Sequence, residues 1–316
     1  MRVLVTGGAG YVGWSVVHDL VGRDGVEEVV IYDNFARRNY GVLLAEKPRG
    51  EATIRVVVDD LLNSRALRRA VESVDCVIHL AAVAMSPDID ENPHVFDQVN
   101  HWGTAELAYA VEQTGAPRLV YLSSGAVYGQ REIVADTETE PNPTNAYGRS
   151  KLAGERQLER LAGKLELNII RSGTVYGVNP AARFDTFVNR FLLDAALGRP
   201  LSVHGSGEQV RPVVPVDIVA KHVVNSALAE TTAAISHTVT ENIAVNTVID
   251  TLKTIDPSLD VIYINQQQQL GGLRMVPLTD SQCVTIGPMS GFAERIMNDF
   301  EQLTINRRGD RVIRSN

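Results

Sequence analysis

Short β-branched runs alternate with amphipathic segments through the first half of the chain, and this alternation limits the fold more than any other feature. The runs read RVLVTG, EEVVIYD, TIRVVVDD, DCVIHLAA, RLVYLSS and LNIIRSG. The segments between them have the apolar spacing of crossover helices, at about 11–22, 63–72, 95–114 and 145–163. We therefore predict an α/β fold built on a doubly wound parallel sheet.

The alternation weakens after about residue 176, which predicts a second, smaller lobe. There NPAARFDTFVNRFLLDAALGRP predicts a helix, and the turn-rich VHGSGEQVRP follows it. Further on, VRPVVPVDIVAKHVVNSALAE predicts a strand and a helix capped by Asp217. We expect this pair to return to the first domain. The predicted division is a first domain over 1–176 with a return of about 210–230, interleaved with a lobe over 177–316.

Composition excludes several classes of partner. A net charge of -8 and a pI near 5.4 disfavour a nucleic-acid surface, which needs clustered Lys and Arg. No apolar stretch approaches the ~20 residues of a membrane span, and the N-terminus lacks the long apolar region of a signal peptide. Cys76 and Cys283 are too few and too far apart for a disulfide framework or a zinc cluster. We expect a cytoplasmic protein without a metal.

A glycine-rich loop directly follows the first predicted strand. Gly7, Gly10 and Gly13 in VLVTGGAGYVG are spaced Gly-x-x-Gly-x-x-Gly and end at the start of a helix. Glycines there allow a tight turn and a close approach of the backbone to a pyrophosphate, whose charge is stabilised by the helix N-terminus. The pattern predicts a Rossmann-type dinucleotide site.

The end of the second strand predicts which dinucleotide binds. Asp33 lies twenty residues beyond Gly13, where a carboxylate accepts hydrogen bonds from the adenosine ribose and repels a 2′-phosphate. This favours NAD over NADP. Arg37 and Arg38 follow closely and leave phosphate binding open as an alternative to two solvated loop charges.

Three side chains predict proton-transfer chemistry. Tyr147 and Lys151 in NAYGRSKLAGE are four residues apart on a predicted helix, so they share one face. A nearby ammonium favours the phenolate of a tyrosine, whose free pKa of about 10 makes it a poor base. Ser124 ends the fifth strand, at the sheet edge where ligands bind in this architecture. We predict that all three are catalytic.

These motifs together carry a family resemblance. TGGAGYVG, Asp33, HLAA at 79–82, LSSGAVYG and the Tyr147–Lys151 pair resemble the extended short-chain dehydrogenase/reductases. Within them, the chain is most similar to the NAD-dependent nucleotide-sugar epimerase/dehydratase family, which includes UDP-glucose 4-epimerase. The resemblance is strong through about residue 177 and fades over the last 50 or so residues.

The resemblance implies a set of binding residues. It places Asp60 and Leu61 beside the adenine, has Asn100 support the loop after the fourth strand, and has Lys151 also hold the nicotinamide ribose. The implied cofactor residues are Gly7, Gly10, Tyr11, Val12, Gly13, Asp33, Asn34, Asp60, Leu61, Leu80, Ala81, Ala82, Asn100, Tyr147 and Lys151. The implied substrate residues are Ser124, Thr174, Arg211 and Arg274, with Arg211 on a substrate diphosphate and Arg274 as a second candidate.

The residues after Ser124 narrow the reaction. Related dehydratases carry an acid pair there and related decarboxylases a Glu, whereas this chain has Gly125 and Ala126. Hydride chemistry remains: Tyr147 takes a hydroxyl proton while hydride passes to NAD. Return of the hydride to the other face of the keto sugar gives epimerisation, which we expect at C4 of a nucleotide-linked sugar.

Two other functions stay open. Release of the ketone would make the enzyme an NAD(P)-dependent sugar dehydrogenase or, in reverse, a 4-ketoreductase. A non-catalytic NAD-sensing regulator is the alternative from another class, although such proteins typically lose the Tyr and Lys that this chain keeps.

RSGTVYG departs from the family's Arg-Pro-Phe-Asn-Val-Tyr-Gly, which implies a differently shaped sugar pocket. By the same resemblance we expect a homodimer that pairs through 95–114 and 145–163.

Overall fold

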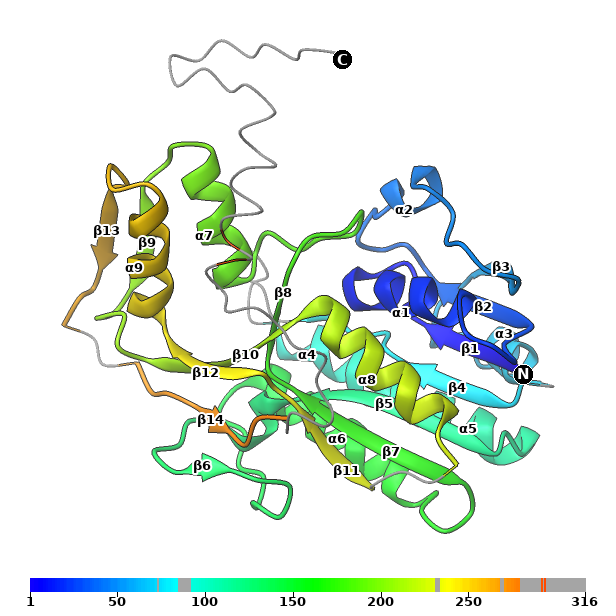
Figure 1. The fold of residues 1–316 in the computed structure, drawn as a ribbon. Helices are drawn as coiled ribbons and strands as arrows, with labels where there is room; N and C mark the ends of the chain where they lie inside the picture. Colours follow the sequence, from blue (N-terminus) through cyan, green and yellow to red (C-terminus); the bar gives the residue numbers. More distant parts are fainter. Residues whose placement is uncertain are drawn as a thin grey trace.

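A seven-stranded parallel sheet forms the centre of the molecule (Figure 1). The structure is a computed structural model that describes residues 1–72, 74–84, 92–230, 234–267, 270–278, 291 and 293. The strand order is β11-β7-β5-β4-β1-β2-β3, and each neighbouring pair is parallel. The strands are β1 (Arg2–Thr6), β2 (Glu28–Asp33), β3 (Thr53–Val58), β4 (Cys76–His79), β5 (Arg118–Ser124), β7 (Glu166–Ser172) and β11 (Ile235–Thr238). The predicted fold class is confirmed, and β11 is a strand that the sequence pattern did not reveal.

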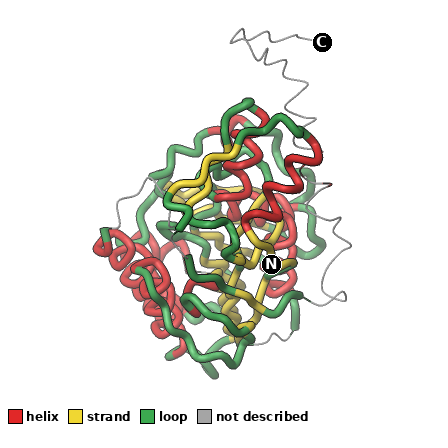
Figure 2. Tube along the Cα trace, turned by 90° about the vertical axis from the view of Figure 1, so that its left-hand side faces the viewer, coloured by secondary structure: helices red, strands yellow, loops and turns green. Residues whose placement is uncertain are grey.

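Helices cover both faces of this sheet, as Figure 2 shows from the side. On one face α1 (Tyr11–Val21) packs against α8 (Val216–Leu228). The other face is covered by α3 (Ser64–Val71), α5 (Gly103–Thr114) and α6 (Ala146–Glu159). Because β1 sends Val3 and Val5 to the first face and Leu4 to the second, its run is apolar throughout. Within the described ranges, no helix is long and apolar enough to cross a membrane.

The predicted helix over 95–114 is interrupted in the structure. It consists of α4 (Pro93–Phe96), the π-helix η1 (Asp97–Trp102) and then α5. The remaining short elements of this part are α2 (Gly41–Leu44), η2 (Gly125–Tyr128) and β6 (Val134–Ala135).

A smaller group of elements packs beside the carboxyl ends of the large sheet (Figure 1). Its three-stranded sheet has the order β12-β10-β8, from β12 (Glu241–Ala244), β10 (Val210–Pro215) and β8 (Thr174–Tyr176). The other members are α7 (Phe187–Ala196), α9 (Val245–Ile255), β9 (Leu201–His204) and β13 (Val261–Ile264). Strand β14 (Arg274–Met275) pairs with β6 and so ties this group back to the first part of the chain.

The predicted cap of α8 is wrong. The N-cap residue is Pro215, which makes no side-chain cap hydrogen bond, and Asp217 lies in the first turn. A carboxylate there still interacts favourably with the helix dipole, and the fixed φ of proline suits the helix start. The helix returns to the large sheet, whereas β10 stays in the smaller one.

Candidate active site

One cavity of about 1210 Å³ runs along the carboxyl ends of the central strands. It is larger than the pockets that usually hold one small ligand, so it has room for a dinucleotide and a second molecule. Most of the residues singled out from the sequence line it. They are Gly7, Gly10, Tyr11, Val12, Gly13, Asp33, Asn34, Asp60, Leu61, Leu80, Ala81, Ala82, Ser124, Tyr147, Lys151, Thr174 and Arg211.

The glycine loop forms a cradle that side chains would fill. Gly7 has a φ of +71°, and a Cβ there would lie 2.6 Å from the backbone N of Ala81. A Cβ on Gly13 would overlap the carbonyl O of Gly7. Helix α1 starts directly after Gly10, which is its N-cap. This arrangement fits the predicted dinucleotide, since backbone and helix N-terminus face the cavity without side chains between.

The carboxylate of Asp33 is fixed at the end of β2. Its two oxygens accept hydrogen bonds from the backbone N–H groups of Phe35, at 2.8 Å, and Ala9, at 3.0 Å. Burial raises the pKa of Asp33, and these two bonds oppose the rise. Arg37 also lines the cavity, where it pairs with Asp185 at 3.4 Å, and Arg38 does not line it. The Asp33 carboxylate is thus held at the cavity wall, and Arg37 is already paired with a carboxylate.

Ser124, Tyr147 and Lys151 all line the cavity. Ser124 ends β5 and hydrogen-bonds Tyr147, which lowers the pKa of the phenol against the larger rise caused by burial. Lys151 Nζ donates to the carbonyl O of Leu122 at 2.8 Å and lies 4.2 Å from the ring centre of Tyr121. Burial lowers the pKa of Lys151 to about 7. The predicted set therefore lines one cavity, with a buried lysine among its members.

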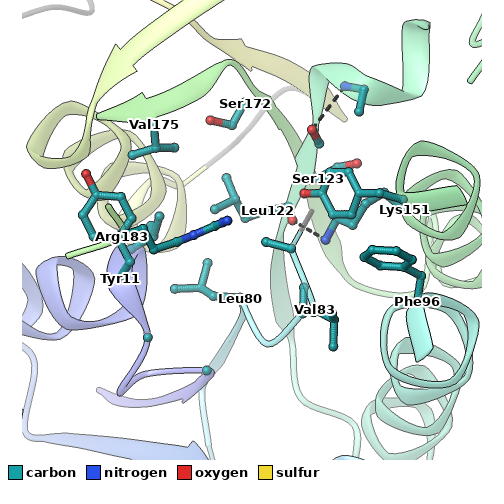
Figure 3. A pocket seen from close by; sticks show the side chains of 18 of the residues that line it. Tyr11, Leu80, Val83, Phe96, Leu122, Ser123, Lys151, Ser172, Val175 and Arg183 are labelled. Carbon is teal, nitrogen blue, oxygen red and sulfur yellow. Dashed lines mark hydrogen bonds between the residues drawn. The ribbon is translucent and has the colours of Figure 1, made fainter. Parts of the chain in front are cut away.

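Arg183 is a cavity residue that no sequence motif indicates. Its side chain extends into the cavity in Figure 3, and its guanidinium forms two 2.9 Å contacts with Asp185. Burial raises the pKa of Tyr147, and the positive charge of Arg183 opposes that rise, an effect predicted for Lys151. No motif marks this loop before α7, because its position depends on how the smaller group of elements packs over the glycine loop.

Asn100 is buried behind the cavity rather than in its lining. Its Oδ1 accepts from Val83 N at 2.8 Å, and its Nδ2 donates to Val83 O at 2.9 Å and to Ser150 Oγ at 3.0 Å. Asn100 thus joins the loop after β4 to helix α6. This is the supporting position that the sequence predicted, and it is not a position of direct contact with a ligand in the cavity.

The comparisons with known proteins decide the family. The sequence model of the NAD dependent epimerase/dehydratase family matches residues 3–239. The chain belongs to this family. The predicted family and its NAD cofactor are thereby confirmed.

Individual relatives include more than one activity. The chain is 28% identical over 221 residues to a dTDP-glucose 4,6-dehydratase of Mycobacterium tuberculosis, a match covering 69% of this chain and 66% of that protein, just under two thirds. It is 31% identical to a putative UDP-glucose 4-epimerase of Methanocaldococcus jannaschii, covering 69% and 71%. The solved UDP-glucose 4-epimerase of Thermus thermophilus in complex with NAD is 26% identical, with a TM-score of 0.79 and coverage of 95% and 99%.

Of the two arginines predicted for a substrate diphosphate, one reaches the cavity. Arg211 lines it and donates to the carbonyl O of Gly271 at 2.7 Å and of Val210 at 3.0 Å. Burial lowers the pKa of Arg211, and no carboxylate of the described residues pairs with it. Arg274 is exposed and outside the lining, because its neighbours Leu273 and Met275 point inward.

At two glycines in the family motifs, neighbouring segments occupy the space that a side chain would need. A Cβ on Gly125 would overlap Sδ of Met275, which is fully buried. A Cβ on Gly173 would lie 2.8 Å from the carbonyl O of Pro212 on β10. The room that an acid at 125 or a Phe at 173 would need is therefore taken by side chain and backbone of other segments. Met85, at the edge of the loop after β4, lies outside the described residues.

Proposed function

We propose that this protein is an NAD-dependent epimerase that acts on a nucleotide-linked sugar, at C4 through a transient 4-keto sugar. The observation that carries the proposal is the meeting of Ser124, Tyr147 and Lys151 on the wall of the cavity that also holds the glycine cradle. UDP-glucose 4-epimerases among the relatives and solved structures support it.

Each of the three side chains has one task in this proposal. Tyr147 takes the proton of the sugar hydroxyl and later returns it. Ser124 hydrogen-bonds both Tyr147 and the substrate oxygen. The Lys151 ammonium, held by the carbonyl of Leu122, stabilises the phenolate and the nicotinamide ribose. Bound NAD supplies reversible hydride acceptance.

The site argues against elimination of water, although a dehydratase is among the relatives. Dehydration needs further groups that move protons on carbon, and Gly125 and Ala126 have none to offer. Met275 also occupies the space beside Gly125. Proton transfer at one hydroxyl is what the described side chains support best.

Product analysis with limiting cofactor tests this proposal. UDP-, dTDP-, GDP- and CDP-sugars would each be incubated with the enzyme and NAD well below the substrate concentration. We expect isomeric product far in excess of the NAD supplied. Product capped at the NAD supply, with NADH accumulating, would make the protein a dehydrogenase. Dehydrated product would contradict the proposal.

Arg211→Gln should raise KM for the nucleotide sugar by roughly 10- to 100-fold, because a hydrogen bond to a charged group contributes about 1.5–3 kcal/mol. NAD affinity should stay unchanged, since the proposed partner of Arg211 is the substrate diphosphate. Arg274→Gln is the matched control, as that side chain is exposed outside the cavity. Equal KM values for the two variants in steady-state kinetics would rule out a diphosphate site at Arg211.

We further propose a homodimer and a cytoplasmic location. Val95, Trp102 and Tyr109 leave exposed apolar surface along α4, η1 and α5, next to α6. Large apolar side chains on one face are a common basis for pairing with a second copy. Light scattering tests the assembly, and a monomer at micromolar concentration would contradict it.

A further inference from the structure

A buried ion pair lies under the candidate catalytic residues and has no task in the proposed mechanism. Glu155 on α6 is fully buried and Arg171 on β7 is 3% exposed. They join through two contacts, Nη2 to Oε2 at 2.7 Å and Nε to Oε1 at 3.2 Å. A pair removed from water this completely is costly to form, so its retention calls for a reason beyond stability.

The end of β5 connects this pair to the catalytic wall. Leu122 accepts from Lys151 Nζ through its carbonyl at 2.8 Å, and the next residue, Ser123, donates through Oγ to Oε1 of Glu155. Lys151 and Glu155 are four residues apart on α6, so they lie one turn apart on its buried face. Consecutive residues of β5 therefore hold the lysine and the carboxylate, and Ser124 comes directly after them.

The other groups that face Lys151 are neutral. Tyr147 on its own helix and Tyr121 on β5 are phenols whose pKa values burial raises. His79 on β4 is buried, which lowers its pKa to about 3 and keeps the imidazole uncharged. Burial lowers the pKa of Lys151, and Glu155 is the charged group of the described residues that raises it.

Beyond Glu155, Arg171 contacts Tyr128. Its Nη1 donates to the Tyr128 hydroxyl at 2.8 Å, its guanidinium lies 4.9 Å from the centre of that ring, and the hydroxyl lies 2.7 Å from His237 Nε2. Burial, and then the positive charge of Arg171, lowers the pKa of His237. The arginine thus fixes the Glu155 carboxylate through two contacts, and the Tyr128 hydroxyl in turn holds the arginine.

We propose that Glu155 is a positioning residue whose carboxylate, fixed by Arg171 and Ser123, keeps the Lys151 amine protonated in its buried pocket. The inference rests on the proposed function only in that Lys151 serves the reaction as an ammonium. Without the carboxylate, burial alone acts on the lysine, which then loses its proton at a lower pH. Activity should fall with it, because a neutral amine no longer favours the Tyr147 phenolate.

The test uses Glu155→Gln and measures Lys151 directly. Competitive labelling with acetic anhydride, quantified by mass spectrometry across pH, gives the titration of Lys151 without any substrate. We expect its midpoint to move down by about one pH unit, and the alkaline limb of the kcat profile to move equally, a roughly tenfold loss on that limb. Glu159→Gln, an exposed residue on the same helix, should leave both unchanged.

A double variant separates this role from a purely structural one. Glu155→Met with Arg171→Met removes both buried charges without leaving either unpaired, a change that proteins often tolerate well. We expect it to fold and to show the same shift of Lys151, and it decides the question if Glu155→Gln does not fold. A wild-type Lys151 titration in either variant would overturn the proposal. A shifted titration in an enzyme that epimerises no nucleotide sugar would retain it and reject the proposed function.

Discussion

Replacement of Tyr147 by phenylalanine should lower kcat by roughly 10²- to 10⁴-fold, the usual contribution of a positioned acid–base group. The ring contacts Phe96 edge-on with centroids 6.0 Å apart, and phenylalanine keeps that contact. The fold and the NAD affinity should therefore stay as they are. The change removes only the hydroxyl that Ser124 binds and that would take the substrate proton.

Steady-state kinetics of the isomerisation and calorimetric titration with NAD check this result together. Tyr109→Phe is the control, because Tyr109 is 54% exposed on α5 and does not line the cavity. Undiminished turnover in Tyr147→Phe would reject the mechanism. Loss of NAD binding in the same variant would mean that the phenol holds the cofactor rather than moves a proton.

Gly7→Ala should produce the second large effect, on cofactor binding. The added methyl group would lie 2.6 Å from the backbone N of Ala81 and 2.7 Å from its Cα, and backbone cannot move aside as a flexible side chain can. The loop has to shift, so the cradle no longer fits a pyrophosphate. We expect NAD affinity to fall by at least about tenfold, which corresponds to a loss of only ~1.4 kcal/mol of binding free energy.

Gly163→Ala is matched to it in backbone conformation. Gly163 has a φ of +78°, against +71° for Gly7, and a Cβ there meets no atom within 4 Å. Both variants bear the left-handed penalty of about 1–2 kcal/mol, but only Gly7→Ala adds the collision. Comparing the thermal unfolding and NAD titration of the two variants therefore isolates the effect of the close approach between residue 7 and Ala81. Equal NAD affinity in both would show that the loop does not hold the pyrophosphate.

The fold and the cofactor loop could be predicted because their signals are local. Strands β1, β2 and β4 are buried on both faces and so read as apolar runs, and the glycines of 7–13 follow the first of them directly. Strand β11 escaped prediction because ISHT carries three polar residues, of which His237 is buried against Tyr128 from far along the chain. The cap assigned to Asp217 failed because proline at 215 already starts the helix.

The parts of the site that could not be predicted depend on contacts between distant segments. Arg183 reaches the cavity only because its loop folds over the glycine loop, where Asn179 Nδ2 donates to Tyr11 O at 2.8 Å. Glu155 and Arg171 are sixteen residues apart and meet across a helix–strand contact. The exposed position of Arg274 could have been predicted, because LRM alternates apolar and charged residues as a half-buried strand does.

Met275 fills the space beside Gly125, and this contact affects which side chains position 125 can accept. Asn242 holds Met275 on both sides, with Nδ2 donating to its carbonyl O at 2.8 Å and Oδ1 accepting from its N at 2.9 Å. Because these bonds fix the backbone of Met275, an acidic side chain at 125 needs the Met275 side chain to move or to be replaced. We therefore expect substitutions at 125 and 275 to be coupled, with an acid at 125 tolerated better when residue 275 is smaller.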